Sequence, residues 1–92
     1  MPFGQVLTFL LCLSKAWSSC FEDHADYAGN DLTYFHTPGP EKCQQACETK
    51  AACRYWTFVK APTNRCFLKT ARLNVHRNRP HLVSGPKYCS ST

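Results

Sequence analysis

The segment from residue 43 to residue 69 reads CQQACETKAACRYWTFVKAPTNRCFLK and combines four cysteines with one helix signal and two strand signals. The helix signal begins just before this segment, at Pro40, because proline suits the first position of a helix. Glu41 is favourable near the positive N-terminal end of a helix, and Lys50 near the negative C-terminal end. The sequence therefore predicts a helix from Pro40 to Lys50, directly after a turn at residues 37–40.

Strand signals follow this helix. Residues 54–59 read RYWTFV, an aromatic and β-branched run that is typical of a strand, and residues 65–69 read RCFLK. Between them, the Ala-Pro-Thr-Asn sequence at 61–64 predicts a turn, and a further short strand is expected at 32–36. The sequence thus predicts an α+β fold in which cysteines fasten one helix to an antiparallel hairpin.

Alternation along the two main strands predicts which side chains face the helix, because successive strand residues point to opposite faces. The inward set comprises Trp56, Phe58, Cys66 and Leu68. The outward set, on the solvent side unless another segment covers it, comprises Tyr55, Arg65, Phe67 and Lys69. Aromatic rings flanked by cations would form a platform for a sugar or a protein partner, although single exposed aromatic residues are common on protein surfaces.

The N-terminal region resembles a secretory signal. Residues 6–13 form an apolar run too short to span a bilayer, and Ala16-Trp17-Ser18 offers small residues at a spacing that signal peptidase accepts. Two features depart from the usual pattern, since no Lys or Arg precedes the apolar run and Lys15 follows it. We predict a signal peptide at 1–18 and a secreted, extracellular domain at 19–92, the alternative being a buried N-terminal segment.

Removal of residues 1–18 also removes Cys12, so that seven cysteines become six. A domain of this size buries only a small core, and secreted domains of similar size usually contain disulfides that contribute about 2–4 kcal/mol each. The alternative is a zinc site built from Cys43, Cys47, Cys53 and either Cys66 or a histidine, which would be His24, His36, His76 or His81. The chain lacks paired Cys-x-x-Cys motifs, and an oxidising compartment disfavours free thiolates, so three disulfides are the stronger prediction.

Six cysteines permit 15 pairings. Cys43 and Cys47 would lie one helical turn apart, with Cβ atoms about 5–6 Å from each other, which exceeds the roughly 3.5–4.5 Å of a disulfide. Each therefore needs a partner outside the helix, and Cys53 and Cys66 are available in either order. The two remaining cysteines, near the ends of the mature chain, would close the longest loop.

Three parts of the chain carry a resemblance to a known family. Residues 43–53 follow the pattern Cys-x3-Cys-x5-Cys and lead into the aromatic strand and the later Cys-Phe-Leu-Lys strand. Residues 26–32 read DYAGNDL, and residues 83–89 read VSGPKYC. Together these stretches resemble the PAN/apple domain family.

This resemblance implies more than the residues alone establish. It implies a small disulfide-rich fold in which a twisted antiparallel sheet cradles one helix. By position, it implies disulfides joining Cys43 to Cys66, Cys47 to Cys53, and Cys20 to Cys89, the last being present in only part of the family. Family members typically bind proteins or carbohydrates, often within larger adhesive molecules or protease zymogens, so a non-catalytic binding module is expected.

Charge is distributed unevenly along the mature chain. Residues 20–48 contain all six acidic residues and a single base, Lys42, whereas residues 49–92 contain nine bases and no acid. The densest basic segment, residues 72–81, is expected to be a loop because it contains Pro80. Its three arginines are Arg72, Arg77 and Arg79.

Such a basic segment favours an anionic partner. The candidates are a sulfated or sialylated glycan, the acidic half of a second copy, or nucleic acid, which secretion disfavours. Guanidinium groups match sulfate and carboxylate oxygens bidentately, which gives glycan binding a mechanism. The alternative is a solvated loop that maintains solubility.

No catalytic, cofactor or metal motif is found in the sequence, and Asp23, His24 and Asp26 are better explained as a solvated cluster than as an acid/base group. No later apolar run is long enough to cross a membrane. The expected function is a secreted recognition module that binds extracellular proteins or carbohydrates. The alternatives are the leading module of a larger protease zymogen or adhesin and, less favoured, a cationic defence peptide. The sequence leaves the oligomeric state open.

Overall fold

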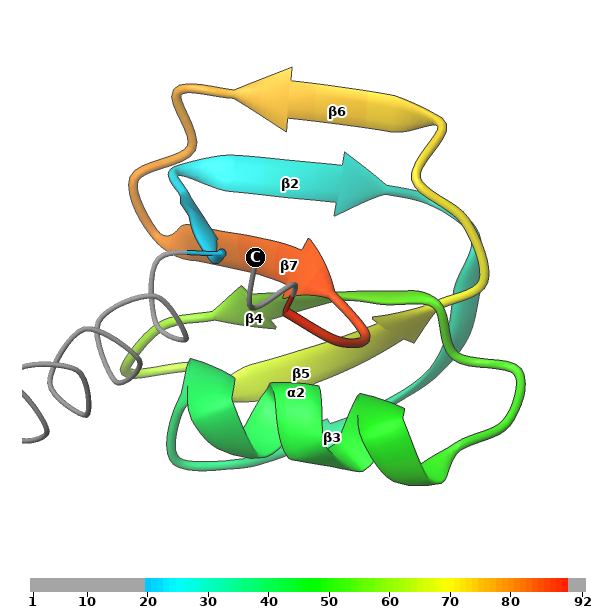
Figure 1. Cartoon of the computed structure of the whole chain (residues 1–92). Helices are drawn as coiled ribbons and strands as arrows, with labels where there is room; N and C mark the ends of the chain where they lie inside the picture. The colour runs from blue at the N-terminus through cyan, green and yellow to red at the C-terminus, as the bar shows by residue number, and fades with distance from the viewer. Residues whose placement is uncertain (1–19, 90–92) are drawn as a thin grey trace, which may run out of the picture.

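A computed structural model describes residues 20–89, so the predicted signal peptide at 1–18 lies outside the described residues. Within this range the chain forms one helix and a series of short strands (Figure 1). In chain order the elements are β1 (Glu22–Asp23), β2 (Ala25–Ala28), β3 (Asp31–His36), α2 (Pro40–Thr49), β4 (Tyr55–Val59), β5 (Arg65–Lys69), β6 (Asn74–Arg77) and β7 (Leu82–Pro86).

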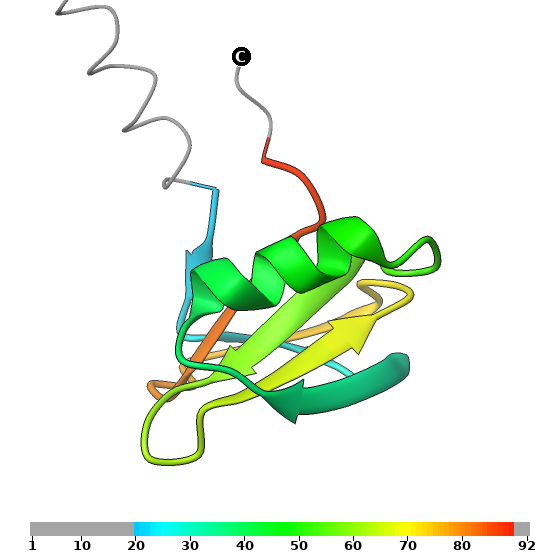
Figure 2. The same ribbon diagram turned by 90° about the horizontal axis from the view of Figure 1, so that it is seen from below.

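These elements form three layers. The central layer is an antiparallel sheet of five strands in the order β1-β7-β4-β5-β3. Helix α2 packs on one face of this sheet, and a two-stranded ribbon of β2 and β6 lies on the other side (Figure 1). Figure 2 shows the helix lying across the strands of the central sheet. The predicted α+β fold, with one helix cradled by an antiparallel sheet, is confirmed.

The core lies between the helix and the central sheet, where the period-2 pattern of β4 and β5 places apolar side chains. Trp56 and Leu68 are cross-strand partners, as are Phe58 and Cys66. All four side chains are almost completely buried, so the predicted inward set is confirmed. Val83 on β7 completes this layer from the other side of β4.

Helix α2 begins at Pro40, as predicted, and ends at Thr49, one residue earlier than predicted. Its N-cap residue, Gly39, makes no side-chain hydrogen bond, so the preset backbone of Pro40 and the favourable charge of Glu41 define the start. Lys50 is the C-cap, and its backbone N–H donates to the Cys47 carbonyl. The buried face of the helix carries both of its cysteines.

Three disulfides fasten the layers together. One joins Cys43 on the helix to Cys66 on β5, with Cα atoms 5.4 Å apart. Another joins Cys47 to Cys53 and closes the turn between the helix and β4. The third joins Cys20 and Cys89 across the two ends of the described chain. These are the same three pairs that the family resemblance implies.

The basic segment at 72–81 differs from the prediction, because Asn74–Arg77 forms strand β6 rather than a loop. Pro80 does not interrupt this strand, because β6 ends at Arg77. Asn78, the residue after the strand, has a positive φ. β6 pairs along its whole length with β2, from Ala25 opposite Arg77 to Ala28 opposite Asn74. The strand thus depends on a partner far away in the sequence, which local patterning does not reveal.

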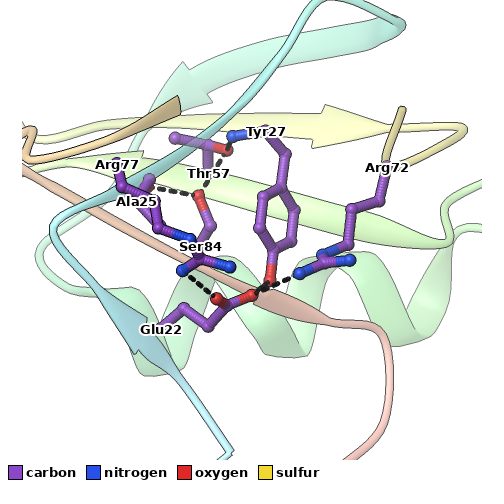
Figure 3. Close-up of polar contacts among 7 residues, drawn as sticks. All are labelled: Glu22, Ala25, Tyr27, Thr57, Arg72, Arg77 and Ser84. Carbon is purple, nitrogen blue, oxygen red and sulfur yellow. Dashed lines mark hydrogen bonds and ion pairs between the residues drawn. The ribbon is translucent and has the colours of Figure 1, made fainter. Parts of the chain in front are cut away.

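The free edge of β2 is anchored to the central sheet by two buried hydroxyl groups (Figure 3). The Tyr27 N–H donates to Thr57 Oγ1 at 3.2 Å, and Ser84 Oγ donates to the Ala25 carbonyl at 2.7 Å. Because the only Ser84 hydroxyl proton is used in this way, Thr57 must donate the 2.7 Å bond between the two hydroxyls. This relay satisfies backbone groups that would otherwise be buried without partners.

Candidate functional site

Glu22 organises the polar surface beside the ribbon. Its carboxylate accepts hydrogen bonds from three side chains that come from different parts of the chain (Figure 3). Arg72 donates at 3.1 Å and Arg77 at 2.8 Å, and the Tyr27 hydroxyl donates to the same oxygen as Arg72. The Arg72 guanidinium also lies over the Tyr27 ring, 5.0 Å from its centroid. One carboxylate therefore fixes two cations and a phenol.

These contacts shift the ionisation of each group. The hydrogen bond from Tyr27, reinforced by the two arginines and opposed by burial, lowers the pKa of Glu22 to about 2. Burial and the bond to Glu22 raise the pKa of Tyr27 to about 12. The Tyr27 and Glu22 hydrogen bonds raise the pKa of Arg72. At neutral pH the network therefore holds one carboxylate, two guanidinium groups and a neutral phenol.

The structure brings together two of the three arginines predicted to bind an anion. Arg72 and Arg77 share Glu22, whereas Arg79 lies beyond β6, where its backbone N–H donates to the His24 carbonyl. The Arg77 side chain is 62% exposed and that of Arg72 36%, so both are accessible from solvent. Among the described residues, Glu22 is the one carboxylate that forms ion pairs with these three arginines.

The predicted outward set is divided between two places. Tyr55 packs edge-on against Tyr27, with ring centroids 5.7 Å apart. Phe67 instead packs against Tyr34, with centroids 5.6 Å apart, and Arg65 lies over the Tyr34 ring. Within residues 20–89 no ring contact joins Tyr55 to Phe67. The single aromatic platform expected from alternation is therefore two separate pairs.

Lys69 differs from the prediction that it faces solvent, because its side chain is only 5% exposed. Its ammonium group forms an ion pair with Asp31, at the start of β3. It also lies 5.3 Å from the centroid of the Phe67 ring. Another part of the chain, Asp31 on β3, therefore contacts Lys69, which is the exception stated with the prediction.

A cleft of about 250 Å³ lies between the ribbon and the outer face of the central sheet. Its polar lining includes the carboxylates of Asp26 and Asp31 and the ammonium of Lys69, and Phe67 is part of its apolar lining. Acceptors and a donor beside an apolar ring suit a neutral compound that carries hydroxyl groups. With two acidic residues and one lysine, this lining carries a net negative charge, which disfavours an anion.

A second hollow, a shallow groove of about 290 Å³, lies at the end of β4 and β7. It is lined by Arg54, Tyr55, Pro86, Lys87 and Tyr88. Tyr55 is among the residues predicted from the sequence, whereas the two cations and Tyr88 are not. The available signal was the recurrence of a basic residue followed by tyrosine, at 54–55 and at 87–88. We call this hollow the Arg-Tyr/Lys-Tyr groove.

Among residues 20–89, no group of His, Cys, Asp and Glu side chains is arranged to hold a metal ion. The described part of the chain also contains no helix of sufficient length and hydropathy to cross a membrane. All six of its cysteines are in disulfides.

Comparison with known proteins places this fold. A sequence model of the PAN domain matches residues 25–69. The structure is similar to the two N-terminal apple domains of Toxoplasma gondii microneme protein 4, with 31% identity, a TM-score of 0.63 and coverage of 74% of this chain. The chain spans only 44% of that two-domain structure.

A PAN module from Eimeria tenella is also similar in fold, with a TM-score of 0.57 and 23% identity, over 77% of this chain and 81% of that module. A search of curated protein sequences found no significant match.

Proposed function

Because the chain belongs to the PAN/apple domain family, we propose that it acts outside the cell as a non-catalytic recognition module whose ligand is an anionic glycan. Domains of this family are generally non-catalytic modules that bind proteins or carbohydrates, and they are typically extracellular. The predicted signal peptide at 1–18 is consistent with secretion. The choice of an anionic glycan depends on the charge of this particular chain.

The observation that supports this ligand is the incompletely neutralised positive charge beside the ribbon. Arg72 and Arg77 share one carboxylate, that of Glu22, and Arg79 makes no ion pair among the described residues. These three arginines and Glu22 together carry a net charge of +2 at neutral pH. A surface of one sign attracts a ligand of the opposite sign, and this attraction weakens as salt rises.

Glu22 also prepares the arginines for binding. By holding Arg72 and Arg77 in place, it removes part of the side-chain freedom that each would lose on meeting a ligand. A guanidinium group has five N–H donors, so each arginine keeps donors for the oxygens of a sulfate or carboxylate. The network therefore presents ordered cations rather than a mobile basic loop.

Heparin affinity chromatography tests this proposal. Wild-type protein should bind at about 0.15 M salt and elute on a salt gradient, because salt screens the attraction between its cations and the sulfate groups of heparin. An R77S/R79S variant should elute at lower salt, whereas K42S/K60S, which removes the same charge elsewhere, should elute near the wild type. Passage of the wild-type protein through the column without retention would contradict the proposal.

A neutral carbohydrate is a second candidate, favoured by the cleft that combines Asp26, Asp31 and Lys69 with Phe67. Carboxylates accept hydrogen bonds from sugar hydroxyls, and the aromatic ring provides an apolar surface for the C–H groups. A panel of neutral monosaccharides, measured by calorimetry against wild type and D26N, tests this candidate. Binding that D26N abolishes would make the cleft the principal site.

Whether the module acts alone or as the leading part of a larger zymogen or adhesin stays a prediction. A transcript that extends the reading frame past Thr92 would favour the larger protein. The defence-peptide alternative predicts that the purified protein causes leakage from lipid vesicles.

A further inference from the structure

We propose that the Arg-Tyr/Lys-Tyr groove is the anchoring site for a sulfated sugar, and that the glycan continues from it toward Arg72 and Arg77. This inference deepens the proposed function and rests on it. In this proposal the principal cations are Arg54 and Lys87, which lie outside the basic segment at residues 72–81.

The central sheet builds the groove from two segments that are distant in sequence. Tyr55 on β4 pairs with Pro86 on β7, and the Lys87 N–H donates to the Arg54 carbonyl at 2.9 Å. On its other side, the Arg54 N–H donates to the Lys69 carbonyl at 2.8 Å. The backbone of Arg54 is thus held from both neighbouring strands, so its side chain extends from a fixed point.

The groove has positive charge that no carboxylate offsets. None of its five lining residues is acidic, and among the described residues neither Arg54 nor Lys87 takes part in an ion pair. Lys87 Nζ donates one hydrogen bond, to the Lys50 carbonyl at 3.0 Å. A lysine ammonium has three donors, so Lys87 can hold this position and still bind a ligand oxygen.

Two tyrosines provide the surface for a sugar ring. Tyr88 is 64% exposed, and the ammonium of Lys87 lies 5.7 Å from the centroid of its ring. Tyr55 is half-buried, and Tyr27 packs against it from the ribbon side. A pyranose lying on such rings would place a sulfate substituent beside the two cations, and each phenol hydroxyl can bond a sugar hydroxyl.

The neighbours of the groove favour a polymer with repeated charges. Tyr55 contacts Tyr27, and the Arg72 guanidinium lies over the Tyr27 ring. Glu22 then links Arg72 to Arg77. Further cations therefore lie beyond the groove, separated from it by the ring pair of Tyr55 and Tyr27. A sulfated glycan would use this continuation, whereas a single sulfated tyrosine on a peptide would place only one sulfate in the groove.

Calorimetric titration with a heparin-derived hexasaccharide at about 0.15 M salt tests the inference. We expect R54S/K87S to weaken binding by at least about tenfold, because two charge-assisted contacts are lost. R77S/R79S should weaken it by less, and the charge-matched K42S/K60S by less than about twofold. Y88S, which keeps both cations, should also weaken binding and shows whether the ring contributes.

Three results would overturn the inference, and they differ in their meaning. If R54S/K87S binds like wild type while R77S/R79S does not, the anchoring site is wrong but anionic-glycan binding stands. If a tyrosine-sulfated peptide binds more tightly than the hexasaccharide, the groove recognises a protein. If wild type binds no sulfated probe, both the site and the proposed function fail. A desulfated hexasaccharide should not bind, which distinguishes sulfate from carboxylate recognition.

Discussion

Replacing Gly85 by alanine should destabilise the fold through a single steric contact. A Cβ atom at this position would lie 2.6 Å from Trp56 Cζ2 and 3.0 Å from Cε2, well inside ordinary contact distances of 3.4–4 Å. The indole ring is fully buried and is fixed by a hydrogen bond from its N–H to the Pro86 carbonyl and by edge-on packing against Phe21. It therefore has little room to withdraw.

The magnitude follows from the displacement required. To restore an ordinary contact, the ring and β7 must separate by roughly 0.8 Å, the difference between the 2.6 Å distance and the 3.4 Å lower limit of contact. Forced overpacking of this kind costs about 1–3 kcal/mol in well-packed cores. Because Gly85 and Trp56 are cross-strand partners, the same movement would disturb the β4–β7 pairing that forms the groove.

Urea or thermal unfolding of the disulfide-intact protein measures the effect. Gly39→Ala is the control, because its Cβ would meet only the flexible end of the Glu41 side chain, at 3.3 Å, and the loss should be smaller. In a Trp56→Phe background, Gly85→Ala should cost little further stability, because the smaller ring removes the contact. Equal losses for Gly85→Ala in both backgrounds would refute the steric explanation.

Three further predictions concern the polar contacts and the terminal disulfide. Ser84→Ala leaves the Ala25 carbonyl without its donor and should reduce the free energy of unfolding by about 1–3 kcal/mol; an unchanged urea midpoint would argue against the relay. The pKa of Glu22 is about 2 in the folded protein against an ordinary 4.5, so its stabilisation is complete above about pH 4.5 and is lost as pH falls toward 2. Glu22→Gln should reduce this pH-dependent change in the free energy of unfolding by about 1–2 kcal/mol, a modest value because solvent partly screens the exposed ion pairs. A pH profile identical to that of the wild type would contradict this prediction. Replacing Cys20 and Cys89 by serine should lower stability by about 2–4 kcal/mol while the other two disulfides still form, as peptide mapping would show.

Local patterns in the sequence were sufficient to predict the layer that contains the core. The alternation of Trp56 and Phe58 with their neighbours is set within five residues, and the helix start at Pro40 depends on residues beside it. The burial of these side chains between helix and sheet then follows, because the pattern of each element specifies which of its faces is apolar. The predicted elements that depend on such short-range information agree with the structure to within a residue or so.

The candidate site was less predictable, because its contacts are distant in sequence. Asn74–Arg77 becomes a strand only through pairing with β2, and Glu22 meets Arg72 and Arg77 across 50 and 55 residues. Lys69 is buried and forms an ion pair with Asp31, 38 residues away. The groove likewise needs the β4–β7 pairing before its two basic-tyrosine pairs meet. Charge composition indicated an anionic ligand but not which cations lie together.

The most direct test of the account is a two-dimensional amide NMR titration of the wild-type protein with the sulfated hexasaccharide. We predict that the largest chemical-shift changes occur at Arg54, Tyr55, Lys87 and Tyr88, with smaller changes extending to Arg72 and Arg77. Added salt should reverse these changes. Changes concentrated around Asp26 and Phe67 in the cleft, or no saturable change at all, would contradict it.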